Sequence, residues 1–313
     1  MVLNSKSKNN VGVMLISHGS TLPFASNVFN EITEKFKKLS DYPVEIGYMK
    51  VSSPTISQAA HNLSLKSVDK IIAMPIFLAD GIHTLIDIPL MLGMDNKEVD
   101  PRSPDGVYPK EHYLNNIDDM DFDGEVTLLD CIGPDNLILQ IVKNKVDVVF
   151  TNSENLNKEN TGIILISHGS RLNYNSEFIN ELLRVFKDET DYKATLGFME
   201  LTNPTIPVAI NEFLKNNDFK NLIAVPVFIA PGMHTKRDIP KILKLPTDFK
   251  SKEGHHHHDH HHSHHDYNHH GHSHTHDDVE MEFDGKVIYL DPIGSDPLLI
   301  DIIKQRVDAE VNK

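Results

Sequence analysis

The sequence predicts an α/β protein made of two tandem domains, each a parallel β-sheet flanked by helices. The first observation is an internal repeat, because seven of ten residues are identical between 11–20 and 161–170. In each copy a short apolar run ends in the same pentapeptide, Ile-Ser-His-Gly-Ser. The second observation is that such apolar runs alternate with amphipathic segments. That alternation is typical of parallel sheets whose two faces are covered by helices.

The first elements of each copy follow from their periodicity. The apolar runs 11–16 and 161–166 predict buried strands. Each is followed by an apolar stripe with helical spacing, which predicts a helix packed by one face on the sheet. A short strand then closes at Gly47-Tyr48-Met49-Lys50. Ser53-Pro54 after it predicts a helix start, because serine caps helices and proline tolerates the first turn.

The later elements repeat in the same order. A strand is predicted at 71–78, and its counterpart at 222–229. A Gly-x-His-Thr turn and the tripeptide Asp-Ile-Pro follow in both copies, and a last unit predicts one strand, a turn and an amphipathic helix. We therefore expect domains at 1–150 and 158–313, joined by a polar linker. A repeat of this length indicates gene duplication rather than a solenoid.

Two inserts interrupt the repeat at the same relative place, after Asp-Ile-Pro. They span 95–122 in the first half and 251–278 in the second, and the second contains 14 of the chain's 20 histidines. Such polar composition predicts mobile surface loops without a packed core. Clustered imidazoles bind Ni²⁺, Co²⁺, Zn²⁺ and Cu²⁺ in many geometries, so the histidine tract predicts metal capture or storage.

Composition excludes several classes of function. The formal net charge of −15 argues against general binding of nucleic acids, which requires clustered Lys and Arg. No apolar run is long enough for a membrane span, and the polar start lacks the apolar core of a secretory signal. The single cysteine, Cys131, fits a reducing compartment. We therefore expect a cytoplasmic protein.

Three polar side chains follow strands of the second half. His168 follows its first strand, Glu200 its second and His234 its third. The carboxyl ends of parallel strands meet at one edge of the sheet, where ligands bind. A histidine after a single strand is often only a hydrogen-bonded loop residue, but the repeated pair favours a metal-binding or acid–base role. Glu200 is a candidate third ligand or proton acceptor.

The two halves differ around these positions. His18 and His83 are the corresponding candidate metal ligands of the first half, but Lys50 stands at the position of Glu200. The second half also carries three cations near its histidines, and they predict binding of a ligand with several carboxylates. These candidate binding residues are Arg171, Lys236 and Arg237.

Four motifs of the second half carry a resemblance to a known family. They are the strand with Ile-Ser-His-Gly-Ser-Arg, then Gly-Phe-Met-Glu, Asn-Pro-Thr-Ile, and Pro-Val-Phe-Ile-Ala-Pro-Gly-Met-His-Thr. Together they resemble class II tetrapyrrole chelatases of the sirohydrochlorin type, and the resemblance extends over both halves outside the inserts. The histidine-rich segment is similar to that of long, duplicated cobaltochelatases. The resemblance implies two chelatase-like domains.

The resemblance also implies an activity. Members are lyase-type metal chelatases that insert a divalent metal, here Co²⁺, into sirohydrochlorin with release of two protons, a step of anaerobic cobalamin biosynthesis. It implies that His168 and His234 bind the metal with help from Glu200, and that no organic cofactor is needed. Short members pair as homodimers, so the duplicated chain is expected to be a monomer that acts as a fused pseudo-dimer.

Three alternatives stay open at the level of sequence. Histidine and glutamate ligands do not separate Co²⁺ from Ni²⁺, so nickel insertion for a nickel tetrapyrrole is one. Insertion of Fe²⁺ into the same substrate is a weaker one. The third lies outside enzymes: a metal-storage or metallochaperone module built on the same fold.

Overall fold

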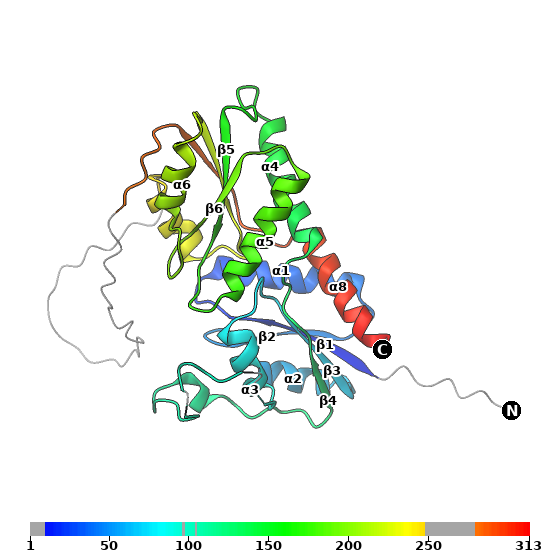
Figure 1. The fold of residues 1–313 in the computed structure, drawn as a ribbon. Coiled ribbons are helices and arrows are strands. Elements are labelled where there is room, and N and C mark those ends of the chain that lie inside the picture. Colours follow the sequence, from blue (N-terminus) through cyan, green and yellow to red (C-terminus); the bar gives the residue numbers. More distant parts are fainter. Residues whose placement is uncertain (1–9, 96–97, 104, 248–278) are drawn as a thin grey trace.

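The computed structural model describes residues 10–95, 98–103, 105–247 and 279–313 (Figure 1). The predicted histidine tract, 251–278, therefore lies outside the described residues. The strands of the first half are β1 (Val11–Ser17), β2 (Val44–Tyr48), β3 (Lys70–Pro75) and β4 (Glu125–Leu128). Its α-helices are α1 (Pro23–Leu39), α2 (Ile56–Ser64), α3 (Ile88–Met91) and α4 (Asn136–Thr151).

The second half repeats this order. Its strands are β5 (Thr161–Ser167), β6 (Ala194–Phe198), β7 (Asn221–Pro226) and β8 (Lys286–Tyr289). Its α-helices are α5 (Tyr174–Glu189), α6 (Ile206–Leu214), α7 (Ile239–Ile242) and α8 (Pro297–Val311). In each half a π-helical turn precedes the third helix, at His83–Asp87 and His234–Asp238. The described residues contain no helix that is long and apolar enough to cross a membrane.

Each half forms one four-stranded parallel sheet, as predicted. The strand orders are β2-β1-β3-β4 and β6-β5-β7-β8. The central strands are buried on both faces, and alternate side chains enter different cores: Val13 and Leu15 face one, Met14 and Ile16 the other. This is the two-residue period of a strand inside a continuous apolar run.

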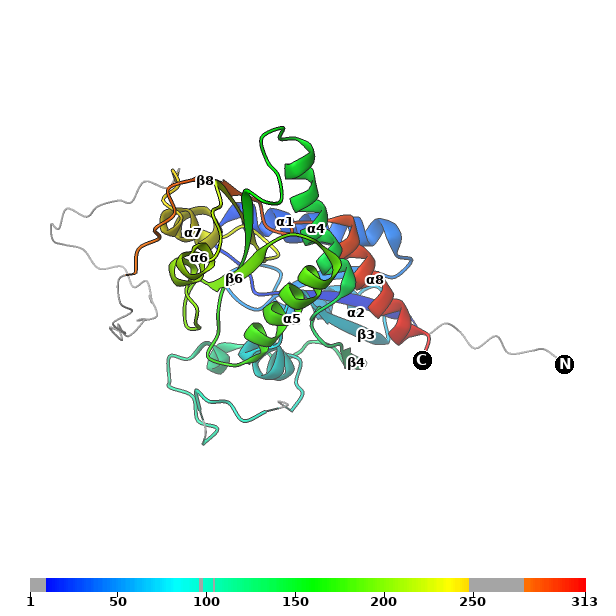
Figure 2. The same cartoon turned by 45° about the horizontal axis from the view of Figure 1, so that its top comes forward.

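The two sheets enclose a shared layer of helices. One large core joins the inner faces of both sheets through α1, α4, α5 and α8. Separate cores lie on the outer faces, under α2 and α3 in the first half and under α6 and α7 in the second. Figure 2 shows α4, α5 and α8 side by side between the sheets. The halves thus share a single apolar interior.

The last helix of each half packs against the other half. Helix α8 contacts β3 and α1 of the first half, and α4 contacts α5 of the second half (Figure 1). Matching contacts support both placements. Tyr42 donates a hydrogen bond to Asp308 of α8 at 3.5 Å, and Tyr192 donates one to Asp147 of α4 at 2.6 Å. The two halves have therefore exchanged their terminal helices.

Two expectations from the sequence are wrong. Helix α2 does not start at Ser53-Pro54 but at Ile56, because Thr55 caps it by accepting a hydrogen bond from the backbone N–H of Gln58 at 3.2 Å. The first insert is also not an unpacked loop. Its Leu114 is buried against the outer core of the first half, and Arg102 pairs with the buried carboxylate of Asp87.

Candidate metal centre

Backbone pairing places Glu200 beside His168. Strands β5 and β6 run parallel in register, with Ser167 opposite Phe198. The pairing continues past the strand ends, because the backbone N–H of Glu200 donates to the carbonyl of His168 at 3.0 Å. Two side chains 32 positions apart in sequence thus leave the same edge of the sheet together.

Gly169 lets the two segments approach this closely. Its φ is +91°, a conformation that residues with a Cβ atom rarely adopt. A Cβ atom at this position would lie 1.8 Å from the carbonyl oxygen of Glu200. Gly19 has the same relation to Lys50 in the first half, at 1.9 Å. The glycine of the repeated pentapeptide is therefore required by this close passage.

His234 enters the site from the π-helical turn after β7. Its Nδ1 lies 2.9 Å from a carboxylate oxygen of Asp238, four residues later in the turn. The Nδ1 of His168 lies 2.9 Å from the carbonyl oxygen of Gly169. Since both partners accept hydrogen bonds, Nδ1 is the donor in each ring, which leaves Nε2 as the nitrogen available to a metal. Such hydrogen bonds set the tautomer and direction of metal-binding histidines.

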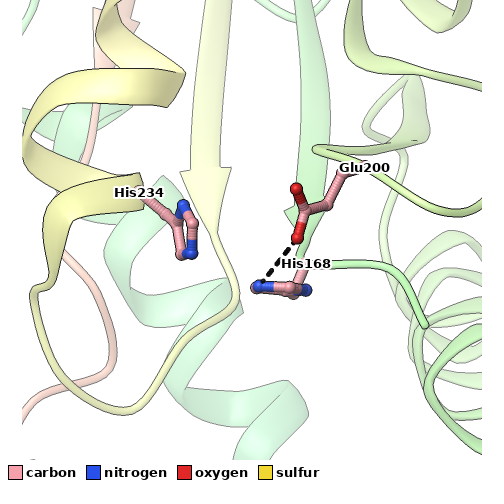
Figure 3. A group of neighbouring side chains, drawn as sticks. All are labelled: His168, Glu200 and His234. Carbon is pink, nitrogen blue, oxygen red and sulfur yellow. Dashed lines mark ion pairs between the residues drawn. The ribbon is translucent and has the colours of Figure 1, made fainter. Parts of the chain in front are cut away.

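The three predicted side chains converge in front of the sheet edge (Figure 3). One potential ligand atom from each of His168, Glu200 and His234 lies within 4.8 Å of the others. His168 Nε2 is 3.4 Å from Glu200 Oε1, and the two imidazole centroids are 4.9 Å apart. Two imidazoles and a carboxylate suit a divalent transition metal and leave coordination positions open. Among the described residues this is the one group of three that can hold a metal.

The three predicted cations follow His168 or His234 within three positions of the sequence but differ in their contacts. Arg171 is exposed. Lys236 pairs with Asp291 at 3.3 Å. Arg237 donates to Asp238 at 2.7 Å, and this contact lowers the pKa of Asp238 against the opposing effect of burial. Arg237 thus supports the carboxylate that orients His234.

The first half has the same histidine geometry without the third ligand. The rings of His18 and His83 are 4.9 Å apart, and the Nδ1 of His18 faces the carbonyl of Gly19 at 3.0 Å. Lys50 stands in the position of the carboxylate. Loss of hydration around the ring, with the nearby charges of His83 and Lys50, lowers the pKa of His18 to about 4. The first half therefore presents two imidazoles beside a cation.

The predictions from sequence missed two supporting residues. One is Asp238, whose position was visible as the repeated Asp-Ile-Pro tripeptide. The other is Asn175, whose side-chain oxygen contacts the hydroxyl of Ser167 at 3.0 Å and accepts from the N–H of Gly169 at 3.1 Å. Its counterpart is Ala25, and the buried hydroxyl of Ser17 accordingly finds no hydrogen-bond partner among the described residues. The sequence signal for Asn175 was this difference between the two halves, asparagine in one and alanine in the other.

Curated relatives match one half of the chain at a time. A sirohydrochlorin cobaltochelatase of Methanothermobacter thermautotrophicus is 44% identical over 154 residues, which cover 49% of this chain and 95% of that protein. A sirohydrochlorin cobaltochelatase of Methanocaldococcus jannaschii is 44% identical over 145 residues, covering 46% of this chain and 95% of that protein. The duplicated chain thus corresponds to two lengths of these relatives.

Solved structures resemble the whole chain. SirB from Bacillus subtilis with Fe³⁺ has a TM-score of 0.66 at 16% identity and covers 96% of this chain and 95% of its own. The sirohydrochlorin chelatase SirB from Bacillus subtilis subspecies spizizenii in complex with cobalt has a TM-score of 0.62 at 13% identity, with the same coverage. At these identities the likeness shows the fold. The sequence model of the CbiX family matches residues 12–149 and again 162–310, so the chain belongs to the CbiX family.

Proposed function

We propose that the protein inserts Co²⁺ into sirohydrochlorin, and that the second half carries the site. The observation that supports this most is the group formed by His168, Glu200 and His234, whose ligand atoms lie within 4.8 Å of one another. Two relatives that each match about half of the chain over 95% of their own length are named sirohydrochlorin cobaltochelatases. The metal and the tetrapyrrole are both substrates in this reaction, so no organic cofactor takes part.

The arrangement fits the chemistry of metal insertion. Two neutral imidazoles and one carboxylate bind the ion but leave positions for the nitrogen atoms of the macrocycle. Two N–H protons leave the macrocycle as the metal enters. Glu200 is a suitable acceptor for one of them, because its carboxylate is partly exposed and lies beside His168. A histidine released as the ring nitrogens take its place on the metal is a suitable acceptor for the other. Insertion needs neither redox chemistry nor ATP, so the protein contributes positioning and proton removal.

The cations around the group supply the contacts for the substrate's carboxylates. Arg171 is exposed, and within the described residues no ion pair engages it. We assign Arg171 to the first capture of a carboxylate group. Lys236 and Arg237 are engaged with Asp291 and Asp238, so they serve the substrate only by exchanging these partners.

The test is an absorbance assay of sirohydrochlorin with Co²⁺, Ni²⁺ and Fe²⁺ in turn. We expect H168A and H234A each to lose more than about 100-fold in rate. Mutation of residues that only orient metal ligands already lowers metal affinity or activity by about 10–100-fold. H18A and H83A are matched controls, because each removes an imidazole ring from the corresponding turn of the first half. Wild-type rates in both H168A and H234A would refute the assignment. The preferred ion in this assay decides between cobalt, nickel and iron.

Deletion of residues 254–278 separates an enzyme from a metal-storage protein. A chelatase keeps its turnover without the histidine tract, whereas a storage protein loses most of its bound metal. Equilibrium dialysis with Co²⁺ measures the bound metal, and the absorbance assay measures the turnover of the same preparation.

We further propose a monomer that works in the cytoplasm. The shared core already gives each half its partner within one chain, which removes the need for a second copy. The lone cysteine, Cys131, is buried, and burial raises the pKa of its thiol to about 12, as suits a residue that takes no part in disulfide chemistry. Light scattering in solution checks the monomer.

A further inference from the structure

A cavity of about 590 Å³ lies next to Lys50, between α2 and the first insert. Apolar side chains make its floor, namely Met49 after β2, Ile56 of α2 and Met91 of α3. His112 and Tyr113 of the insert form the facing wall. The volume lies within the range of small-molecule sites, which are mostly apolar with a few polar groups.

One cation lines this cavity. Lys50 is half-buried, and its Nζ stands 3.9 Å from the centroid of the Tyr113 ring. Within the described residues no carboxylate pairs with it. The nearby Asp87 is already bonded to His83, Arg102 and Tyr113, and Asp118 lies exposed at the rim. A cation removed from water without a counter-ion is unfavourable, and a bound anion would relieve that cost.

We propose that this cavity binds an organic anion, a carboxylate carried on an apolar or aromatic body, with Lys50 as its counter-ion. The floor of Met49, Ile56 and Met91 takes the body, and the ammonium group takes the carboxylate. Thr55 and Ser57 also line the cavity, but their hydroxyl groups are bonded to the backbone N–H of Gln58 and the carbonyl of Asp119. The replacement of glutamate by lysine thus gives the first half a binding role of its own.

The second half provides a built-in comparison. Glu200 occupies the position of Lys50 there, and a carboxylate would repel the same ligand. We therefore expect one site of this kind per chain, separate from the carboxylate contacts proposed for Arg171 in the second half. The carboxylate has two possible sources, an acidic side chain of the tetrapyrrole or a separate organic anion, and the chemistry of recognition is the same for both.

The probe is 1-pyrenebutyrate, a flat apolar body with one carboxylate, followed by fluorescence anisotropy. We expect saturable 1:1 binding to the full chain. K50M should weaken it by at least about tenfold, the value of a partly buried charge-assisted hydrogen bond. The neutral analogue 1-pyrenebutanol should bind wild type and K50M equally. K38M, an exposed lysine of α1, is the matched control and should change neither probe.

Asn116→Trp tests the cavity itself, because this exposed residue lines it and an indole ring there would fill the space. Both probes should then lose affinity together. Equal binding of 1-pyrenebutyrate to wild type and K50M, or no saturable binding at all, would overturn the proposal. H168A and H234A should retain the anion site, so its failure is distinct from failure of the proposed cobalt insertion.

The source of the carboxylate follows from calorimetric titration of metal-free sirohydrochlorin. A loss of at least about tenfold in K50M identifies an acidic side chain of the tetrapyrrole as the ligand. Unchanged affinity, together with a K50M effect on 1-pyrenebutyrate, identifies a separate organic anion.

Discussion

Gly169 has the strictest requirement of any single residue at the site. We expect G169A to disrupt it, because the new Cβ atom would lie 1.8 Å from the carbonyl oxygen of Glu200 and the backbone has a φ of +91°. Stability should fall by more than about 1 kcal/mol, since alanine is strained at positive φ. Cobalt insertion should fall further, because His168 and Glu200 move apart.

The control for this change is G232A. Gly232 lies in the turn before His234, but a Cβ atom there meets nothing within 4 Å and its φ is not positive. Urea denaturation and the absorbance assay should therefore give values near wild type. An active, stable G169A would show that the close passage is not needed.

Asp238 should act as a positioning residue for His234. D238N keeps the shape of the side chain but removes its negative charge. That charge holds the proton on the Nδ1 of His234, which lies 2.9 Å from the carboxylate oxygen. We expect Co²⁺ affinity, measured by calorimetry without tetrapyrrole, to fall by about 10–100-fold. D291N is the comparison, because Asp291 pairs with Lys236 and not with a candidate ligand. Unchanged affinity in D238N would contradict the role.

The sequence was sufficient to predict which side chains meet, since His168, Glu200 and His234 all follow strands of one parallel sheet. It was insufficient for the residues that hold them. The role of Asp238 depends on a π-helical turn that brings its carboxylate to the Nδ1 of His234, four residues earlier in the sequence. No periodicity in the sequence indicates that turn. Asn175 acts through a loop whose path is set by Gly169.

At the scale of elements, the exchange of α4 and α8 determines how the halves are joined. Arg306 of α8 donates to the carbonyls of Cys131 and Ile132 and pairs with Asp135, all in the first half. We expect R306A to lower the free energy of unfolding by about 1.5–3 kcal/mol, the usual value of hydrogen bonds to a charged group. Urea denaturation followed by circular dichroism measures it.

Arg184 provides the comparison for that variant. It pairs with Glu181 and Asp188 on the exposed face of its own helix. R184A should lower the free energy of unfolding far less than R306A does, because exposed ion pairs contribute little. Equal effects of R306A and R184A would mean that the contact between the halves adds nothing to stability.

The strands and helices themselves were predictable, but the exchange was not. The apolar stripes of α4 and α8 are near copies, and both sheets offer an equivalent inner face. Pattern alone therefore cannot decide which sheet each helix covers. The first insert was mispredicted for a different reason. Its composition is polar, but Arg102, Tyr108 and Tyr113 use their polar groups to bond Asp87 and Asp100.

At the scale of the molecule, the shared core predicts that the halves do not separate. If a protease site is placed in the linker between α4 and β5 and then cut, each fragment still supplies the helix that covers the other. We expect the two fragments to elute together from a size-exclusion column and to unfold in one transition. Separation without denaturant would contradict a shared core. An uncut sample of the same variant is the control.

The exchange of helices also has a consequence for synthesis on the ribosome. When residues 10–151 have emerged, the first sheet still lacks α8, and α4 has no second sheet to cover. The nascent first half therefore exposes apolar surface until helix α8, Pro297–Val311, has left the exit tunnel. The N-terminal half is therefore completed only after the rest of the second half has been translated.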